Sequence, residues 1–131
     1  YGFEKVTGVE LAPELCATAR KNIESCELPS AQKQRISIIQ GDVLDYCKRS
    51  EDDLFFVFRA FSIEFFTAVR LMLAERALQQ NKVLTMIYTQ RLSTDESLEI
   101  HSLSADRAYR KVYETTIWGQ EFHVYQCGRS S

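Results

Sequence analysis

Short apolar runs alternate with amphipathic segments along most of the chain. The first run, KVTGVEL, contains Glu10, and Pro13 begins a segment whose apolar residues recur at helical spacing up to about Cys26. Proline fits the first helical turn, because the N–H group that it lacks has no partner there. A second apolar run, Ile36 to Ile39, ends shortly before Asp42. The first third of the sequence therefore predicts a strand, a helix and a second strand.

The middle of the chain continues this alternation. Leu54 to Phe58 is almost continuously apolar, which is typical of a strand in a parallel sheet with both faces covered. Ser62 is a candidate N-cap for a helix, and VLTMIY predicts a further buried strand. Residues 89–106 are polar and weakly patterned, and we interpret them as a long loop that could include one short helix. The predicted buried face of the helix after Ser62 consists of Phe65, Val69, Met72, Leu73 and Ala77.

Two β-rich runs close the sequence. YRKVYETTIW and EFHVYQC meet at Gly119-Gln120 and predict a tight antiparallel hairpin. Strands that alternate with helices predict an α/β fold with a mostly parallel sheet, right-handed crossovers and helices on its faces. Because 131 residues suit one domain with its own core, we expect a single α/β domain, residues 1–131, that ends in the hairpin.

Composition narrows the possible classes of protein. The 16 basic and 18 acidic residues give a net charge of −2, so the basic surface typical of nucleic-acid binders is not expected. No apolar run approaches the roughly 18–20 residues needed to span a bilayer, and no signal peptide is visible. We therefore expect a soluble cytoplasmic protein with reduced thiols and no metal site, because no CxxC pair occurs among Cys16, Cys26, Cys47 and Cys127.

Two acids follow successive predicted strands. Ligands of open α/β sheets bind beyond the carboxyl ends of the strands, where Glu10 and Asp42 are expected. The two oxygens of Glu10 can accept hydrogen bonds from a ribose diol. Asp42 can accept a hydrogen bond from the exocyclic amine of a purine, and Val43 next to it offers an apolar side chain and a backbone N–H. Either acid alone could equally be a helix cap or a solvated loop residue, but both together favour a nucleoside pocket.

The same segments resemble a known family. GFEKVTGVELAPELCATARKNIE followed by ISIIQGDVLDY resembles the second and third strand regions of class I S-adenosylmethionine-dependent methyltransferases, which have a Rossmann-like fold. The similarity continues through DDLFFVFRAFS, the fourth-strand region, and the terminal hairpin, so that it covers about Gly2 to Cys127. The resemblance implies that S-adenosylmethionine is the cofactor and that its binding residues include Glu10 for the ribose, Asp42 for the adenine amine, Leu11 and Val43 beside the ring, and Phe58.

One departure from the family concerns its first motif. The glycine-rich turn after the first strand is expected just before Tyr1, and the sequence contains no GxGxG. That turn lets the backbone approach the cofactor, and its strand is central in the sheet. We therefore expect an N-terminally incomplete domain that lacks the first strand and helix and binds the cofactor weakly. Its unpaired inner strand edges could lead to self-association.

A second departure leaves the methyl acceptor unidentified. Arg59 follows the fourth-strand region, where amine-modifying relatives carry Asn-Pro or Asp-Pro. An arginine side chain cannot accept a hydrogen bond from a substrate N–H group, but Arg59 could bind an anionic substrate group or form a surface salt bridge. Tyr88 and Thr89 end the next strand and could line the substrate entrance or pack in the core.

Other candidates carry weaker signals. His101, in the predicted loop, could act as a base, whereas His123 alternates with apolar residues and should face solvent or a neighbouring element. Trp118 is interpreted as a packing residue. Two other functions stay open: a nicotinamide-binding oxidoreductase, because an acid after the second strand also holds the NAD ribose, and a non-catalytic scaffold with a methyltransferase-like fold.

Overall fold

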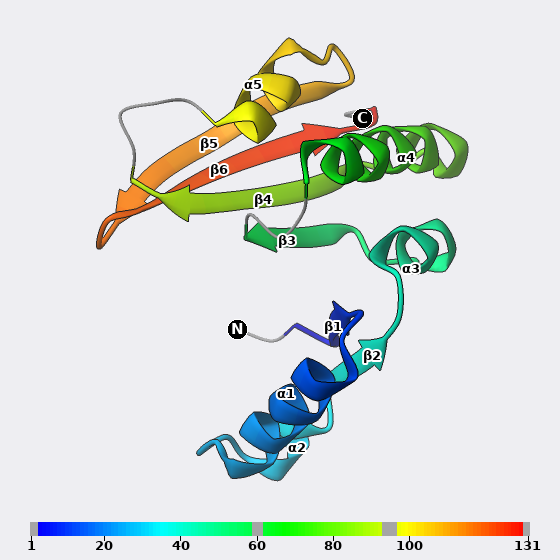
Figure 1. Ribbon diagram of the computed structural model, residues 1–131. Coiled ribbons are helices and arrows are strands. Elements are labelled where there is room, and N and C mark those ends of the chain that lie inside the picture. Colours follow the sequence, from blue (N-terminus) through cyan, green and yellow to red (C-terminus); the bar gives the residue numbers. More distant parts are fainter. Residues whose placement is uncertain (1–2, 59–61, 93–96, 130–131) are drawn as a thin grey trace. The chain divides into compact units, whose positions relative to one another are not determined.

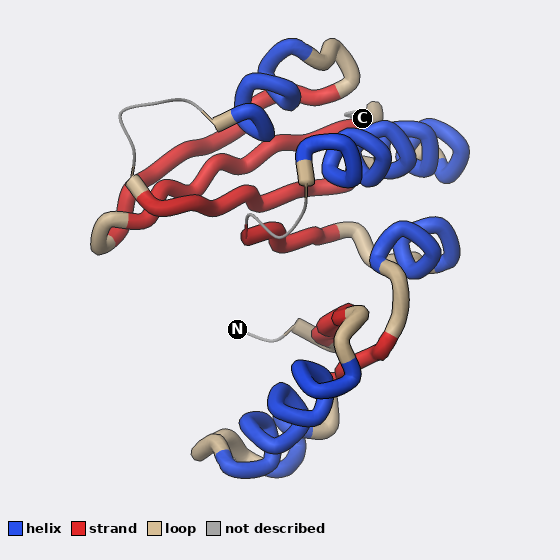
Figure 2. The backbone as a smooth tube through the Cα atoms, in the orientation of Figure 1, coloured by secondary structure: helices blue, strands red, loops and turns tan. Residues whose placement is uncertain are grey.

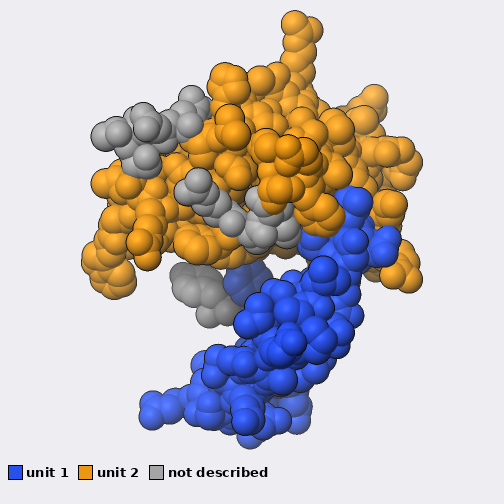
Figure 3. Space-filling model, in the orientation of Figure 1, with its two compact units in different colours: residues 1–46 blue, residues 47–131 orange. Residues whose placement is uncertain are grey.

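The computed structural model describes residues 3–58, 62–92 and 97–129. The chain divides into two units, residues 1–46 and residues 47–131, which Figure 3 shows in blue and orange. Each unit has its own sheet in the described part of the chain.

The first unit is a parallel strand pair connected by a helix (Figure 1). The strand register runs from Val6↔Ile36 to Glu10↔Gln40. The thiol of the buried Cys16 donates to the carbonyl oxygen of Glu10 at 3.4 Å and so fastens the helix to the end of the first strand. The elements are β1 (Val6–Glu10), α1 (Pro13–Ser25), α2 (Ser30–Lys33) and β2 (Ile36–Gln40).

The second unit contains a four-stranded sheet in the order β3-β4-β6-β5 (Figure 2). β3 and β4 are parallel, whereas β6 is antiparallel to both β4 and β5. The predicted α/β class is confirmed. A mostly parallel sheet was predicted, but in this sheet only β3 and β4 pair in parallel. Its elements are β3 (Leu54–Phe58), α4 (Ile63–Gln80), β4 (Leu84–Arg91), α5 (Leu98–Ala105), β5 (Tyr109–Ile117) and β6 (Gln120–Cys127), and the boundary between the units falls in α3 (Val43–Arg49).

α4 and α5 cover the same face of the four-stranded sheet (Figure 1). The ring of Phe66 on α4 meets Tyr88 of β4 edge-on, with ring centroids 5.9 Å apart. The hydroxyl of Ser104 on α5 lies 3.3 Å from that of Tyr125 on β6. Alternation along the paired strands places both tyrosines on this face. The core between the two helices and the sheet comprises Leu84, Met86, Tyr88, Tyr125 and Cys127 of the strands and Phe66, Val69, Leu73 and Leu103 of the helices.

α4 begins where the sequence predicts. The hydroxyl of Ser62 accepts a hydrogen bond from the backbone N–H of Phe65 at 3.2 Å, which confirms the predicted N-cap. The predicted buried face is partly wrong, because Phe66 and Arg76 are fully buried while Phe65 and Met72 are only half-buried.

The terminal hairpin is confirmed with a shifted turn. β5 ends at Ile117 and β6 begins at Gln120, so the turn residues are Trp118 and Gly119, with φ of 49° and 74°. Two consecutive positive φ angles are typical of the two-residue hairpin turns that match strand twist. The packing role expected for Trp118 is wrong, because its side chain is 98% exposed. The predicted loop over residues 89–106 begins too early, since β4 extends to Arg91, whereas α5 is a short helix of the kind allowed for within it.

The cysteines are free thiols, and three of them are buried: Cys16, Cys47 and Cys127. Burial raises the pKa of the Cys47 thiol to about 11, so this thiol stays protonated and unreactive at neutral pH. No helix among residues 3–58, 62–92 and 97–129 combines the length and apolar character required to cross a bilayer. The same residues contain no group of three His, Cys, Asp or Glu side chains suited to a metal ion.

Candidate nucleoside-binding site

Glu10 is the last residue of β1, and its carboxylate folds over the beginning of α1. Glu10 Oε1 accepts a hydrogen bond from the backbone N–H of Ala12 at 3.1 Å. Ala12 is the N-cap residue of α1 and has no side-chain oxygen of its own to cap the helix. This contact fixes the direction of the carboxylate and leaves Oε2, with its acceptor sites, for another donor.

Asp42 lies two residues beyond the end of β2 and holds the start of α3 in the same way. Its Oδ1 accepts a hydrogen bond from the backbone N–H of Leu44 at 2.7 Å, and its carbonyl oxygen accepts from Tyr46 N–H at 3.0 Å. The cap role considered from the sequence is therefore present at both acids. It does not exclude ligand binding, because each carboxylate uses one oxygen for the cap and keeps the other.

The strand register brings the two acids to one edge of the unit. Glu10 pairs with Gln40, and the N–H of Gly41 donates to the Glu10 carbonyl oxygen at 3.0 Å. Asp42 follows directly, so Glu10 lies at the carboxyl end of β1 and Asp42 just beyond the carboxyl end of the neighbouring parallel strand β2. Two apolar side chains accompany them: Leu11, which is 72% exposed, and the half-buried Val43 at the first position of α3.

The candidate residues of the second unit have different surroundings. Phe58 ends β3 and is 51% exposed. Tyr88 is fully buried against Phe66 of α4, which agrees with the packing alternative, and its proposed contact with substrate stays a prediction. Arg59 lies outside the described residues. His101 is exposed on α5.

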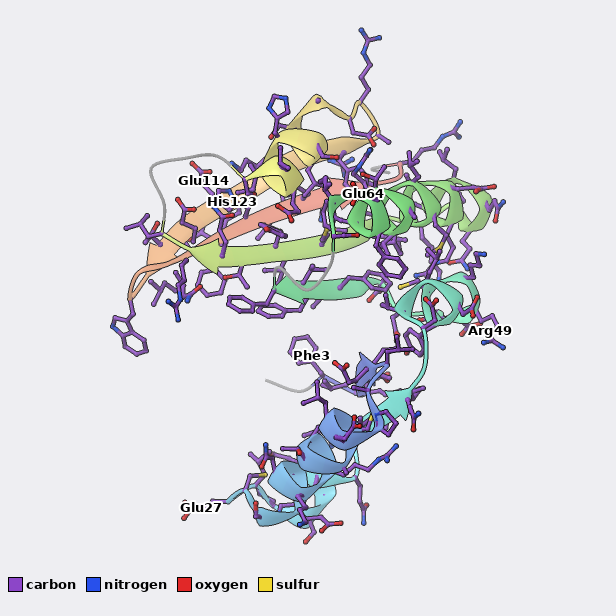
Figure 4. The ribbon with its side chains drawn as sticks, in the orientation of Figure 1. Phe3, Glu27, Arg49, Glu64, Glu114 and His123 are labelled. Atoms are coloured by element: carbon purple, nitrogen blue, oxygen red, sulfur yellow. The ribbon has the colours of Figure 1, made fainter. Side chains whose placement is uncertain are left out.

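A polar cluster on β5 and β6 was not predicted from the sequence. His123 is only 8% exposed; its Nδ1 lies 3.4 Å from Glu114 Oε2 and its Nε2 3.8 Å from Glu121 Oε2. Figure 4 shows Glu114 and His123 beside each other. Glu121 Oε2 also accepts a hydrogen bond from Gln90 Nε2 of β4 at 2.7 Å. We refer to Glu114, Glu121 and His123 as the His123 cluster.

The charges of the His123 cluster are partly balanced by Lys111, whose ammonium group forms an ion pair with Glu114. The hydrogen bond from the Lys111 ammonium group to Glu114 and the charge of Lys111 lower the pKa of the Glu114 carboxyl. His123 lowers this pKa as well. The sequence signal for the cluster was the alternation of polar and apolar residues along β6. It could not identify the partners of His123, because they depend on the cross-strand register.

Comparison with known proteins gives a consistent fold. No family model and no curated protein sequence matches the chain. Solved structures do match. A protein named as a methylase from Haemophilus influenzae superposes with a TM-score of 0.60 and 19% identity, over 96% of this chain and 68% of that one. A protein named as a methyltransferase from Escherichia coli superposes with a TM-score of 0.60 and 10% identity, over 95% of this chain and 64% of that one.

The methyltransferase domain of bacterial CtHen1 superposes with a TM-score of 0.64 and 19% identity, over 97% of this chain and 79% of that domain. The chain therefore spans between about two thirds and four fifths of the length of these three structures. At these identities the comparison establishes the fold alone: the chain has a methyltransferase-like α/β fold.

Proposed function

We propose that this protein is part of an S-adenosylmethionine-dependent methyltransferase. The observation that supports this most is the position of Glu10 at the carboxyl end of β1 and of Asp42 just beyond the carboxyl end of the parallel strand β2. The methyltransferase-like fold supports the same function.

The two acids suit the two ends of a nucleoside. Glu10 would accept hydrogen bonds from the ribose hydroxyls, because its carboxylate retains acceptor capacity after capping α1 through Ala12. Asp42 would accept a hydrogen bond from the adenine amine through the carboxylate oxygen that does not cap α3. Leu11 and Val43 would then contact the faces of the ring. Phe58 also stays a proposed cofactor contact.

The proposed reaction requires mainly positioning by the protein. When bound, S-adenosylmethionine supplies a methyl group that is already activated on a sulfonium. The chain would contribute cofactor orientation and exclusion of water, for which no acid–base pair is required. Arg59 and Tyr88 remain the proposed contacts with a methyl acceptor whose identity the cofactor pocket does not define.

A further part of the proposal concerns the strand edges. Among the described residues β1 pairs only with β2, and β3 pairs only with β4. Each of these two strands therefore has one edge without a strand partner in the described part of the chain. We propose that the chain self-associates through such strand edges, because unpaired backbone N–H and C=O groups can pair with a second copy.

Calorimetric titration with S-adenosylhomocysteine, the demethylated cofactor, tests the function. Saturable binding by the full-length protein, with no binding of NAD⁺, is the expected result. Binding of NAD⁺ alone would instead favour an oxidoreductase. Binding of neither, together with no glycine-rich turn in the residues encoded before Tyr1, would favour a non-catalytic scaffold.

A further inference from the structure

The turn between β5 and β6 contains a residue that is unfavourable for the fold in two ways. Trp118 has a φ of 49°, in the left-handed region that bulky side chains rarely adopt, whereas Asn-Gly is the favoured sequence for such a turn. Its side chain is 98% exposed, so the indole ring gains nothing from burial in the core. Residues that break local rules without a gain in stability are expected at functional sites. Trp118 is therefore a candidate for a role outside the stability of this fold.

Two further apolar side chains accompany Trp118 at the same end of the sheet. Leu92, just after β4, is 60% exposed, and Ile117, the last residue of β5, is 50% exposed. The backbone N–H of Leu92 donates to the carbonyl oxygen of Gly119 at 2.7 Å, which holds the chain after β4 against the turn. We refer to Leu92, Ile117 and Trp118 as the apolar tip. Figure 1 shows this end of the sheet, where β4 and β5 end and β6 begins.

Polar side chains lie directly behind the apolar tip. Arg91, the last residue of β4, and Thr116 of β5 are both exposed, and Gln120 begins β6. Gln120 pairs with Arg91 on one side and with Ile117 on the other, so these residues form one row across three strands. The hairpin thus has an apolar end and, behind it, a polar collar that includes the guanidinium group of Arg91. This arrangement suits a membrane–water interface, where indole rings lie among the lipid headgroups and arginine side chains reach the phosphates.

The size and the hydrogen bonding of the apolar tip also favour a lipid surface. Its three side chains together expose about 400 Å², whereas each partner in a standard protein interface buries about 800 Å². A bilayer needs no matching surface, because lipids rearrange around the side chains that enter the interface. Backbone groups that leave water must be paired within the protein, and the Leu92 N–H and the Gly119 carbonyl oxygen already pair with each other.

From this arrangement we infer that the apolar tip binds reversibly to the surface of a phospholipid membrane. Trp118 enters the interfacial region together with Leu92 and Ile117, and Arg91 contacts the lipid phosphates. Binding is reversible because its free energy increases with the apolar area buried, and that area is small here. The inference is independent of the methyl transfer proposed above, since none of these residues belongs to the candidate cofactor site.

Cosedimentation of the full-length protein with phosphatidylcholine vesicles tests the inference, because a bilayer without net charge isolates the apolar contribution. The wild type should bind saturably, and Trp118→Asn should bind about tenfold more weakly or less, since it removes the largest apolar side chain of the tip. Asparagine suits the positive φ of this position, so Trp118→Asn should unfold at a higher urea concentration than the wild type. Weaker binding by a more stable variant separates a role in binding from a role in folding.

Leu78→Asn is the matched control, because Leu78 of α4 is 67% exposed and lies outside the apolar tip. It should bind vesicles as the wild type does, whereas Leu92→Asn, a second variant of the tip, should bind more weakly. Absence of vesicle binding by the wild type would overturn the inference, and a protein partner with an apolar pocket predicts that result. Equal binding by Trp118→Asn and the wild type would overturn it as well.

A second copy of the chain is the other possible occupant of the apolar tip. Sedimentation velocity without vesicles tests it in the wild type and in Trp118→Asn. Dimers that form in the wild type and are absent in Trp118→Asn would overturn the inference, because the tip would then be an interface between copies. The same oligomeric state in both proteins, together with weaker vesicle binding by Trp118→Asn, is the expected result.

Discussion

Gly128, directly after β6, occupies a position where the backbone leaves no room for a side chain. Its φ is 98°, and a Cβ at this residue would lie 2.0 Å from the carbonyl oxygen of Lys82 and 3.1 Å from the Cβ of Ala77. The obstacle is backbone at the connection between α4 and β4, which cannot rotate away as a side chain would. Glycine at this position therefore allows the end of β6 to pack against that connection.

The variant Gly128→Ala should destabilise the protein more than Gly119→Ala. Both residues have positive φ, so each substitution should cost about 1–2 kcal/mol of backbone strain. A Cβ at Gly119 would meet no atom within 4 Å, whereas at Gly128 the clash should add about 1–3 kcal/mol. Urea unfolding of both variants measures the difference. Equal free energies of unfolding would contradict this account of Gly128.

Arg76 of α4 contacts the end of α3 and the beginning of β3. Its side chain is only 4% exposed, and its Nη1 donates to the carbonyl oxygen of Cys47 in α3 at 2.7 Å. Its Nη2 donates to the carbonyl oxygen of Asp52, just before β3, and the guanidinium lies 5.2 Å from the ring centroid of Phe55. The forked geometry of arginine allows α4 to hold the end of α3 and the entry into β3 at the same time.

Replacement of Arg76 by methionine should lower the free energy of unfolding by about 2 kcal/mol or more, because the buried carbonyl of Cys47 and the partly buried carbonyl of Asp52 each lose the hydrogen bond from Arg76. Arg76→Lys should not restore the loss, since one ammonium group cannot reproduce the fork. The exposed Arg107 offers the control Arg107→Met, for which a change below about 0.5 kcal/mol is expected. Thermal and urea unfolding would show a comparable loss for Arg76→Lys and Arg76→Met. If Arg76→Lys were as stable as the wild type, a positive charge alone would be sufficient for the role of Arg76, and the account of the forked guanidinium would be contradicted.

Local signals in the sequence predicted most of the elements. Apolar runs located the strands, and Ser62 located the start of α4. The burial of Arg76 could not be predicted from helical periodicity, because a charged residue is assigned to the solvent face unless its partners are known. Trp118 was misassigned for a related reason: aromatic residues usually pack, and only the backbone geometry of the turn shows that this side chain projects outward.

At the scale of the whole molecule, both acids of the candidate cofactor site belong to one unit. Their position at successive strand ends was predicted from sequence, and the structure adds the capping hydrogen bonds to Ala12 and Leu44 that fix each carboxylate. The His123 cluster belongs to the other unit and depends on a strand register that the sequence does not encode locally.

The affinity of the full-length protein for S-adenosylhomocysteine, measured by calorimetry in matched variants, tests the central claim most directly. Glu10→Gln and Asp42→Asn keep an oxygen for the capping bonds but remove the carboxylate, so each should weaken binding about tenfold or more. Glu14→Gln, an exposed change in the first turn of α1, should have no effect. Unchanged affinity in Glu10→Gln and Asp42→Asn would contradict the claim that these two acids hold a nucleoside.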